Sequence, residues 1–373
     1  MKTENAREKV QKDCLNAVFK HRKSSAAVSM GVGKTFIGLT YLDKMHKEKK
    51  TSGKYLIVAP KLSIFNTWKQ ECEKHGFEHL IPLLDFVTYR SLDKKEHVYD
   101  AVILDECHNL TYSHDYWLAC FSGYILGLTG TPPKYITSEK GKMVNSHCPI
   151  VYEYITDSAV DDNILNDYSI VVHLLELGTD KNLPVKMKNG KTFYSSEQSM
   201  YDYWSGKIDQ TFGFKELQML RILRMKSMMS FKTKEFYAKE LSKMMSDKCI
   251  VFCNTTEQAD AVCKNSYHSK NPDSEVNLLN FKEGRIDLLS CVQQLNEGVN
   301  IPNLKSGIIL HSYSNERQSA QRMGRLLRLN PDEKSTIHIL AYKNTIDVNW
   351  VSKALESLDS EKITYINSIF QDA

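Results

Sequence analysis

A glycine-containing segment near the N-terminus constrains the fold more than any other part of the sequence. Residues 31–35 read GVGKT; they follow a short run of small and apolar residues and open a stretch, 36–42, that reads as a helix. A strand, a loop and a helix in this order present backbone N–H groups and a helix N-terminus to phosphate groups. In such a loop Lys34 would reach the β- and γ-phosphates, and the Thr35 hydroxyl would ligate Mg²⁺.

The pattern departs from the full phosphate-loop consensus at one position, because Val28 stands where glycine is expected. On this segment alone, a chance Gly-Lys-Thr at the start of a helix is the alternative. A second segment argues against chance. Residues 102–110 read VILDECHNL, in which an apolar run typical of a central parallel strand ends in Asp105 and Glu106.

The carboxyl end of a parallel strand is where open α/β sheets bind their ligands. Taken alone, Asp105 and Glu106 are equally typical of an acidic turn after a buried strand. A metal site on Cys107 and His108 is disfavoured, because adjacent residues seldom converge on one ion and no second pair lies at ligand spacing nearby. Paired with the phosphate loop, the segment is a Walker B element. Asp105 would hold Mg²⁺ through water, and Glu106 would orient and deprotonate the attacking water.

Composition sets broad limits on the rest. The chain has 373 residues, enough for two domains, and 42% of them are hydrophobic and 25% charged, as in soluble globular proteins. The N-terminus does not resemble a signal peptide, and no apolar run approaches the length of a membrane span. The nine cysteines form no C-x-x-C pair, which fits a reducing, intracellular setting. The net charge of +4 allows a polyanionic partner without requiring one.

Further motifs follow in order along the chain, and with GVGKT and DECH they resemble the motor of superfamily 2 helicases and translocases. They are Gln11 ahead of the phosphate loop, YLIVAPKLSIFNTWKQE (55–71), FVTYRSL (86–92), GLTGTPP (127–133), CIVFCNTTEQAD (249–260), LNEGVNIP (295–302) and QRMGRLLR (321–328). TGTP, the glutamine that opens QRMGRLLR and the tryptophan of the 55–71 segment look more like DExH motors of the UvsW, XPB, type III restriction and chromatin-remodeller kinds than like DEAD-box proteins. The compact chain suggests a phage or mobile-element member in a host cytoplasm.

The resemblance implies roles for residues at the matching positions. The ATP contacts would be Gln11, which reads adenine, and Met30, Gly31, Val32, Gly33, Lys34, Thr35, Gly298 and Asn300. The catalytic residues would be Glu106, Gln321, Arg325 and Arg328, with Thr35 and Asp105 at Mg²⁺. Coupling to the nucleic acid would use His108, Thr129, Gly130 and Thr131, and backbone contacts would use Pro60, Lys61, Thr88, Tyr89, Asn254 and Thr255.

The segment QRMGRLLR is the most specific of these matches. Arg325 and Arg328 are three residues apart, so on a helix they share one face. Taken alone, the segment is better explained as a basic surface helix; its position downstream of a phosphate loop and an Asp-Glu pair argues against that explanation. In the family these arginines act as fingers that stabilise charge on the transferring phosphoryl group.

The motif positions predict two tandem RecA-like α/β domains with parallel sheets. Residues 1–150 form the first, with strands near 55–59, 101–104 and 125–128; residues 151–373 form the second, whose first strand lies near Tyr168 and whose end closes with a helix. An insertion spans about 178–248. Its Asn-Gly at 189–190 predicts a hairpin, and residues 214–241 have helical periodicity. The insertion either contacts nucleic acid, as a wedge at a junction, or forms a helical layer with Leu217, Leu220, Met225, Met228 and Met229 in its core.

By resemblance, the chain is a nucleic-acid-dependent ATPase that hydrolyses ATP in the cleft between the two domains and acts on duplex, forked or branched DNA rather than RNA. ATP and Mg²⁺ are the expected cofactors, and no membrane is involved. A translocase or remodeller that never separates strands is one alternative. Another is a nucleotide-gated scaffold without turnover, which does not explain why Lys34, Asp105, Glu106, Arg325 and Arg328 occur together.

Overall fold

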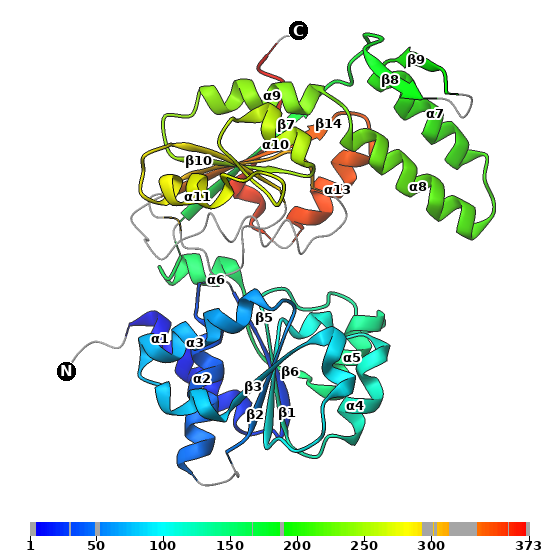
Figure 1. Ribbon diagram of the computed structural model, residues 1–373. Coiled ribbons are helices and arrows are strands. Elements are labelled where there is room, and N and C mark those ends of the chain that lie inside the picture. Colours follow the sequence, from blue (N-terminus) through cyan, green and yellow to red (C-terminus); the bar gives the residue numbers. More distant parts are fainter. Residues whose placement is uncertain are drawn as a thin grey trace. The chain divides into compact units, whose positions relative to one another are not determined.

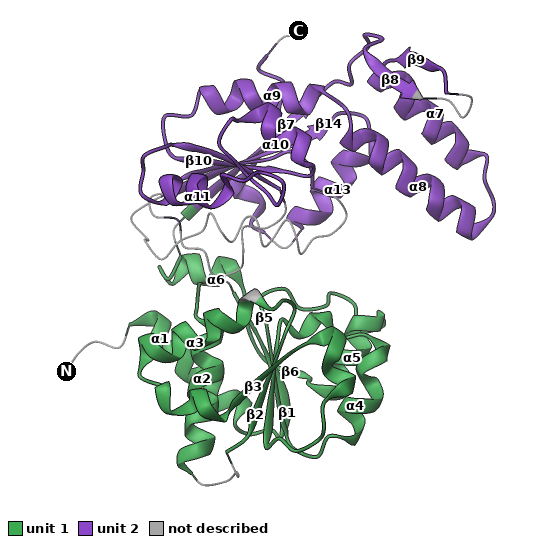
Figure 2. Ribbon diagram, viewed as in Figure 1, with its two compact units in different colours: residues 1–167, 296–298, 327–332 green, residues 168–295, 299–326, 333–373 purple. Residues whose placement is uncertain are grey.

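Two compact units make up the computed structural model (Figures 1 and 2). The first comprises the described residues up to Asp167, and the second comprises those from Tyr168 on. The structure describes residues 5–29, 31–48, 53–165, 167–186, 190–292, 301, 304–312, 334–356 and 358–370. Within these ranges, none of the helices combines the length and the apolar character that crossing a bilayer requires.

The first unit contains a six-stranded parallel sheet with the order β3-β2-β4-β5-β1-β6. Every residue of β2 and β4 is buried, because both faces of a parallel sheet are covered by helices. The expected strands at 55–59, 101–104 and 125–128 are present. The strands are β1 (Lys23–Val28), β2 (Tyr55–Ala59), β3 (Leu84–Thr88), β4 (Ala101–Asp105), β5 (Tyr124–Thr129) and β6 (Ile150–Tyr154).

Helices lie on both faces of this sheet, with α1, α2 and α3 on one side and α4 and α5 on the other (Figure 1). The α-helices are α1 (Ala6–Val18), α2 (Lys34–Lys47), α3 (Ser63–His75), α4 (Asp115–Cys120), α5 (Glu139–His147) and α6 (Thr156–Asp161). Short 3₁₀ turns are η1 (Glu78–Leu83), η2 (Tyr89–Lys94), η3 (Cys107–Asn109) and η4 (Tyr112–His114).

The expected domain boundary after residue 150 falls inside β6. This strand pairs with β1, from Ser25 opposite Ile150 to Val28 opposite Tyr154. Residues 150–154 therefore complete the first sheet, and the division between the two units follows Asp167.

The second unit contains a seven-stranded sheet with the order β11-β12-β10-β13-β14-β7-β15. The expected closing helix is present as α13, and the strand β15 that follows it was not expected; β15 pairs in parallel with β7. The strands are β7 (Asp167–Leu175), β10 (Cys249–Cys253), β11 (Ser266–Tyr267), β12 (Leu288–Val292), β13 (Ser306–Ile309), β14 (Lys334–Tyr342) and β15 (Ile363–Asn367). The helices are α9 (Thr233–Lys243), α10 (Thr256–Val262), α11 (Ser274–Lys282), α13 (Ile346–Leu355) and the 3₁₀ turn η5 (Ser360–Lys362).

Most of the expected insertion forms an antiparallel strand pair and two helices that pack side by side (Figure 1). Its last expected segment is α9, which instead packs in the core of the second unit, so the insertion below means the strand pair and the two helices. The helical run expected over 214–241 is divided, since α8 ends before α9 begins at Thr233. Its elements are β8 (Leu183–Lys186), β9 (Thr192–Ser195), α7 (Glu197–Asp209) and α8 (Phe214–Met229). Of the residues expected in its core, Leu220 and Met228 are buried, and Leu217, Met225 and Met229 are half-buried. At the turn between α7 and α8, Phe212 is 98% exposed and Phe214 is 73% exposed.

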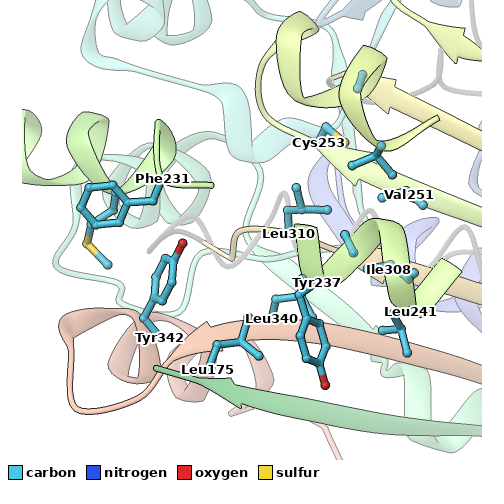
Figure 3. Packing of buried hydrophobic residues seen from close by; sticks show 14 of the residues in the cluster. Leu175, Phe231, Tyr237, Leu241, Val251, Cys253, Ile308, Leu310, Leu340 and Tyr342 are labelled. Atoms are coloured by element: carbon cyan, nitrogen blue, oxygen red, sulfur yellow. The ribbon is translucent and has the colours of Figure 1, made fainter. Parts of the chain in front are cut away.

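The core of the second unit packs α9 and the link before it against the strands. In Figure 3, Phe231 and Tyr342 meet edge to face, while Tyr237 lies beside Leu340. Beside this cluster, fully buried Lys234 of α9 forms an ion pair with Asp347 of α13, with Nζ and Oδ2 2.5 Å apart. Burial lowers the pKa of Lys234, and the charge of Asp347 opposes that shift.

We expect Lys234→Met to destabilise the second unit by about 3–5 kcal/mol, because it leaves the carboxylate of Asp347 buried without its counter-charge. Adding Asp347→Asn should recover part of this loss. Hydrogen exchange of the β13 and β14 amides measures the effect in this unit alone. Lys243→Ala is the matched control: its ammonium is 2.6 Å from Glu240 but 59% exposed, so its removal should cost less than about 1 kcal/mol. If Lys234→Met and Lys243→Ala destabilised the second unit equally, the buried ion pair would not be a special contributor to its stability.

Candidate nucleotide-binding and hydrolysis site

The phosphate loop connects β1 to α2 through two glycines with left-handed backbone angles. Gly31 has φ 86° and Gly33 has φ 99°, a region that residues with a β-carbon rarely adopt. Gly33 is the N-cap of α2, and no side chain among the described residues caps that terminus. The first N–H groups of α2 are consequently available to an anion at the loop, where Lys34 and Thr35 open the helix.

Two side chains of α1 hold this loop through one carbonyl. The Gln11 amide nitrogen donates to the Val32 oxygen at 2.6 Å, and Arg7 Nε donates to the same oxygen at 3.1 Å. A β-carbon at Gly33 would lie 2.9 Å from the guanidinium and 3.0 Å from the amide. The backbone angle requires glycine at position 33, and a β-carbon there would also displace the two side chains that hold the loop. Gln11 was expected at adenine; in the structure its N–H supports the loop, and sequence reasoning missed Arg7.

Glu106 follows β4 with φ 53° and ψ 58°, a left-handed conformation that costs a residue other than glycine about 1–3 kcal/mol. This turn brings its carboxylate to the phosphate loop. Oε1 lies 3.5 Å from Nζ of Lys34, and Oε2 lies 3.4 Å from the Gly130 nitrogen and 3.3 Å from the Thr129 hydroxyl. Glu106 therefore contacts both the loop lysine and the end of β5.

The charge state of Glu106 follows from these neighbours. Burial by itself would raise the pKa of this carboxyl. The ammonium of Lys34, the ring of His108 and the N–H of Gly130 together outweigh burial and hold the pKa below its usual value. Glu106 is thus ionised at neutral pH and accepts hydrogen bonds with both oxygens.

His108 links the Walker B segment to the end of β5. It lies in η3 with only 4% of its surface exposed, and its Nδ1 is 2.8 Å from the Thr129 hydroxyl and 3.4 Å from that of Thr131. The Thr131 N–H donates to the Thr129 hydroxyl at 3.1 Å. The four residues expected to couple the site (His108, Thr129, Gly130 and Thr131) therefore lie together around Glu106.

Asp105 is the last residue of β4 and is 8% exposed. The indole nitrogen of Trp68 donates to its Oδ2 at 3.0 Å, and the Tyr89 hydroxyl donates to its main-chain oxygen at 2.9 Å. The carboxylate of Asp105 and the hydroxyl of Thr35 are oxygen donors of the kind that Mg²⁺ prefers, so this set fits that ion. Sequence reasoning missed the role of Trp68.

The alternative metal site on Cys107 and His108 does not fit the structure. Cys107 is fully buried, and its pKa is raised by a hydrogen bond with Cys148 and by burial, which disfavours a thiolate ligand. Across the ranges that the structure describes, no group of three or more histidine, cysteine or carboxylate side chains could hold a metal ion.

The residues expected to contact nucleic acid differ in how far they are exposed to solvent. Lys61 is exposed and Pro60 half-buried where β2 ends, and Thr88 is half-buried at the end of β3. The Tyr89 side chain is buried with its hydroxyl on Asp105, so a surface contact by this ring does not fit. In the second unit Asn254 and Thr255 are half-buried, and Thr255 caps α10. Six predicted site residues lie outside the described residues: Met30, Gly298, Asn300, Gln321, Arg325 and Arg328.

We expect Gln11→Ala to weaken nucleotide binding about fivefold, because it removes one hydrogen bond of about 1 kcal/mol from the Val32 carbonyl. Displacement of a fluorescent nucleotide by ATP and by GTP measures the loss. A similar factor for both nucleotides identifies support of the loop, whereas a loss confined to ATP identifies adenine recognition. Lys9→Ala, exposed on the same helix, should leave both affinities unchanged.

Family models and a curated relative match both halves of the chain. Residues 3–134 match the family model of the type III restriction enzyme res subunit, and residues 232–330 match that of the helicase conserved C-terminal domain. A relative is the DNA 3'-5' translocase XPB2 of Sulfurisphaera tokodaii. It is 23% identical over 390 aligned positions, which cover 90% of this chain and 82% of that protein.

Solved structures share the fold. The type ISP restriction-modification enzyme LlaBIII, bound to DNA, gives a TM-score of 0.62 at 14% identity; the match covers 98% of this chain and 31% of that one. A fragment of an HsdR subunit from Vibrio vulnificus YJ016 gives 0.62 at 17% identity, covering 97% and 68%. Dbp5 of S. cerevisiae, bound to RNA and ADP BeF₃, gives 0.58 at 11% identity, covering 97% and 90%.

The two models match in the order that the motifs predict, one in each half of the chain, and the relative spans both halves. With a phosphate loop and a Walker B glutamate in contact in the first unit, the chain belongs to the superfamily 2 helicases and translocases, which are ATP-dependent motors.

Proposed function

We propose that this protein is an ATP-driven motor that moves on duplex, forked or branched DNA. The observation that carries this proposal is the arrangement around Glu106, whose carboxylate contacts Lys34 of the phosphate loop and the end of β5 together. A scaffold without turnover does not require a carboxylate held in a left-handed turn against a loop lysine.

The chemistry divides among residues of the first unit. Bound Mg²⁺ would neutralise charge on the transferring phosphoryl group. Thr35 and Asp105 would hold that ion, and the N–H groups at the start of α2 would bind phosphate oxygens. Lys34 would leave Glu106 for the γ-phosphate, and the released carboxylate would then orient the attacking water. Arg325 and Arg328 would complete the site as arginine fingers.

Two comparisons favour DNA over RNA as the polymer on which the protein moves. XPB2 is named a DNA translocase, and LlaBIII was solved bound to DNA. RNA is the alternative, since the fold is shared with Dbp5 bound to RNA. The net charge of +4 is compatible with either polymer.

We expect DNA to stimulate ATP hydrolysis severalfold and RNA to do so less. Glu106→Gln should bind ATP but reduce turnover at least a hundredfold, because the neutral amide cannot accept a proton from water. Arg325→Ala should reduce turnover by a similar factor. The assay compares single-stranded, duplex and forked DNA with RNA. A parent protein that binds ATP and hydrolyses none under any condition would establish the scaffold alternative instead.

We propose strand separation as a second activity, which is favoured by the exposed rings of Phe212, in the turn after α7, and Phe214, the first residue of α8. An exposed aromatic ring can stack on a base at a duplex end, and stacking contributes about 1–3 kcal/mol per base. Lys207 and Lys215 flank this turn and are exposed.

We expect Phe212→Ser with Phe214→Ser to abolish unwinding of forked DNA while leaving DNA-stimulated ATP hydrolysis within about twofold of the parent. Folding should be unaffected, because these rings bury little surface. Strand displacement and ATP hydrolysis are measured on the same forked substrate. Tyr116→Ser, which removes an aromatic ring that is 82% exposed in the first unit, is the control. If the parent hydrolyses ATP on DNA but never separates strands, the translocase alternative holds.

A further inference from the structure

Trp68 connects three parts of the first unit. It is a fully buried residue of α3, and its indole N–H donates to Oδ2 of Asp105 at 3.0 Å. Its ring also fills the space over Gly38 of α2, where a β-carbon would come within 2.7 Å of the ring. One side chain therefore touches the helix of the phosphate loop and the Walker B carboxylate.

Tyr89 fixes the same residue from another direction. Its hydroxyl donates to the main-chain oxygen of Asp105 at 2.9 Å, while its own main-chain oxygen accepts from His114 Nε2 at 3.0 Å. The rings of Tyr89 and His114 pack edge to face with centroids 5.7 Å apart. Asp105 is thus held at its carboxylate by α3 and at its carbonyl by η2.

These contacts bear on metal binding. A hydrogen bond from a neutral donor to an ionised carboxylate is short and strong, and it fixes which oxygen remains for a metal. Outer partners of ligating carboxylates commonly change metal affinity 10–100-fold when they are removed. The hydrogen bond from Trp68 occupies Oδ2 of Asp105 and would therefore restrict how this carboxylate could bind Mg²⁺.

Both supports begin at the surface where nucleic-acid contacts are expected. Helix α3 follows Pro60 and Lys61, and Trp68 lies about 8 Å along the helix axis from its first residue, Ser63. Leu62, at the start of α3, is 69% exposed. Tyr89 follows Thr88 directly and precedes exposed Arg90. A short stretch of chain thus links each surface segment to a side chain that donates a hydrogen bond to Asp105.

We propose that Trp68 and Tyr89 are positioning residues that transmit nucleic-acid binding to the Mg²⁺ site. This inference rests on the proposed function, and it adds the residues through which nucleic-acid binding would reach Asp105. Nucleic acid that binds at the start of α3 fixes the position of that helix, and with it the indole N–H that holds the Asp105 carboxylate for Mg²⁺. Since coupling is reciprocal, nucleic acid lowers the Mg²⁺ concentration needed for nucleotide binding, and Mg²⁺-nucleotide tightens the grip on nucleic acid by the same factor.

The test measures binding rather than turnover. Fluorescence anisotropy of a directly excited ATP analogue is followed as Mg²⁺ is titrated, with and without duplex DNA. In the parent, DNA should lower the half-saturating Mg²⁺ concentration. Trp68→Phe keeps most of the ring volume and deletes the N–H, so it should raise that concentration about tenfold and abolish the effect of DNA. Tyr89→Phe should change both readouts in the same direction.

Trp117→Phe is the matched control. Trp117 is 4% exposed in the same unit, and its indole N–H donates to the Lys95 carbonyl at 2.7 Å, so the substitution deletes a comparable hydrogen bond. It should lower the melting temperature without changing the Mg²⁺ dependence. If Trp68→Phe behaves like this control, the tryptophan is a packing residue and the proposal is overturned.

The failure of the proposed function has a different signature. A parent that binds Mg²⁺-nucleotide but ignores DNA and RNA alike contradicts the motor and the coupling together. The shift in Mg²⁺ dependence caused by Trp68→Phe is visible without any nucleic acid, so it still decides whether Trp68 orients Asp105.

Discussion

The common end of three parallel strands is the constraint on which the candidate site depends. Two residues at the end of β5 have partners in neighbouring strands: Thr129 is paired with Ala27 of β1, and Leu128 is paired with Asp105 of β4. The residues that follow β1, β4 and β5 are therefore neighbours, although they are about seventy and a hundred positions apart in sequence. Alternation along a strand would send Asp105 and Glu106 to opposite faces. The left-handed turn at Glu106 ends that alternation, and its carboxylate meets Lys34 and Gly130.

Burial makes this arrangement specific. A polar group removed from water is costly unless it is hydrogen-bonded, so each buried donor near the site restricts its partner to few orientations. Gln11 and Arg7 fix the Val32 carbonyl, His108 fixes Thr129, and Trp68 fixes Asp105. Several of these pairs join elements that are far apart in the chain. Displacement of one element would therefore shift the carboxylates of Asp105 and Glu106.

Local sequence patterns were sufficient to predict the parts of the site that lie within one element. The glycines of GVGKT and the apolar run before Asp105 placed the phosphate loop and Walker B at strand ends, where the structure has them. The hydrogen bond from Trp68 and the support of Val32 by Arg7 were not predictable in this way. Each joins two elements, and neither periodicity nor spacing reports which side chains meet across a core. The strand β15 was missed for a related reason, because a short C-terminal strand is stabilised by pairing with β7 rather than by its own pattern.

The two halves of the protein place their large side chains under different physical constraints. Trp68 fills a tight space against Gly38, so any change to it alters packing and a hydrogen bond to Asp105 together. Phe212 and Phe214 are largely exposed, so they bury little surface and contribute little to folding. The candidate site in the first unit is therefore built from buried, mutually dependent contacts. The exposed residues of the insertion can change at small cost to the fold, so substitutions there can test the proposed contact with nucleic acid without disturbing the first unit.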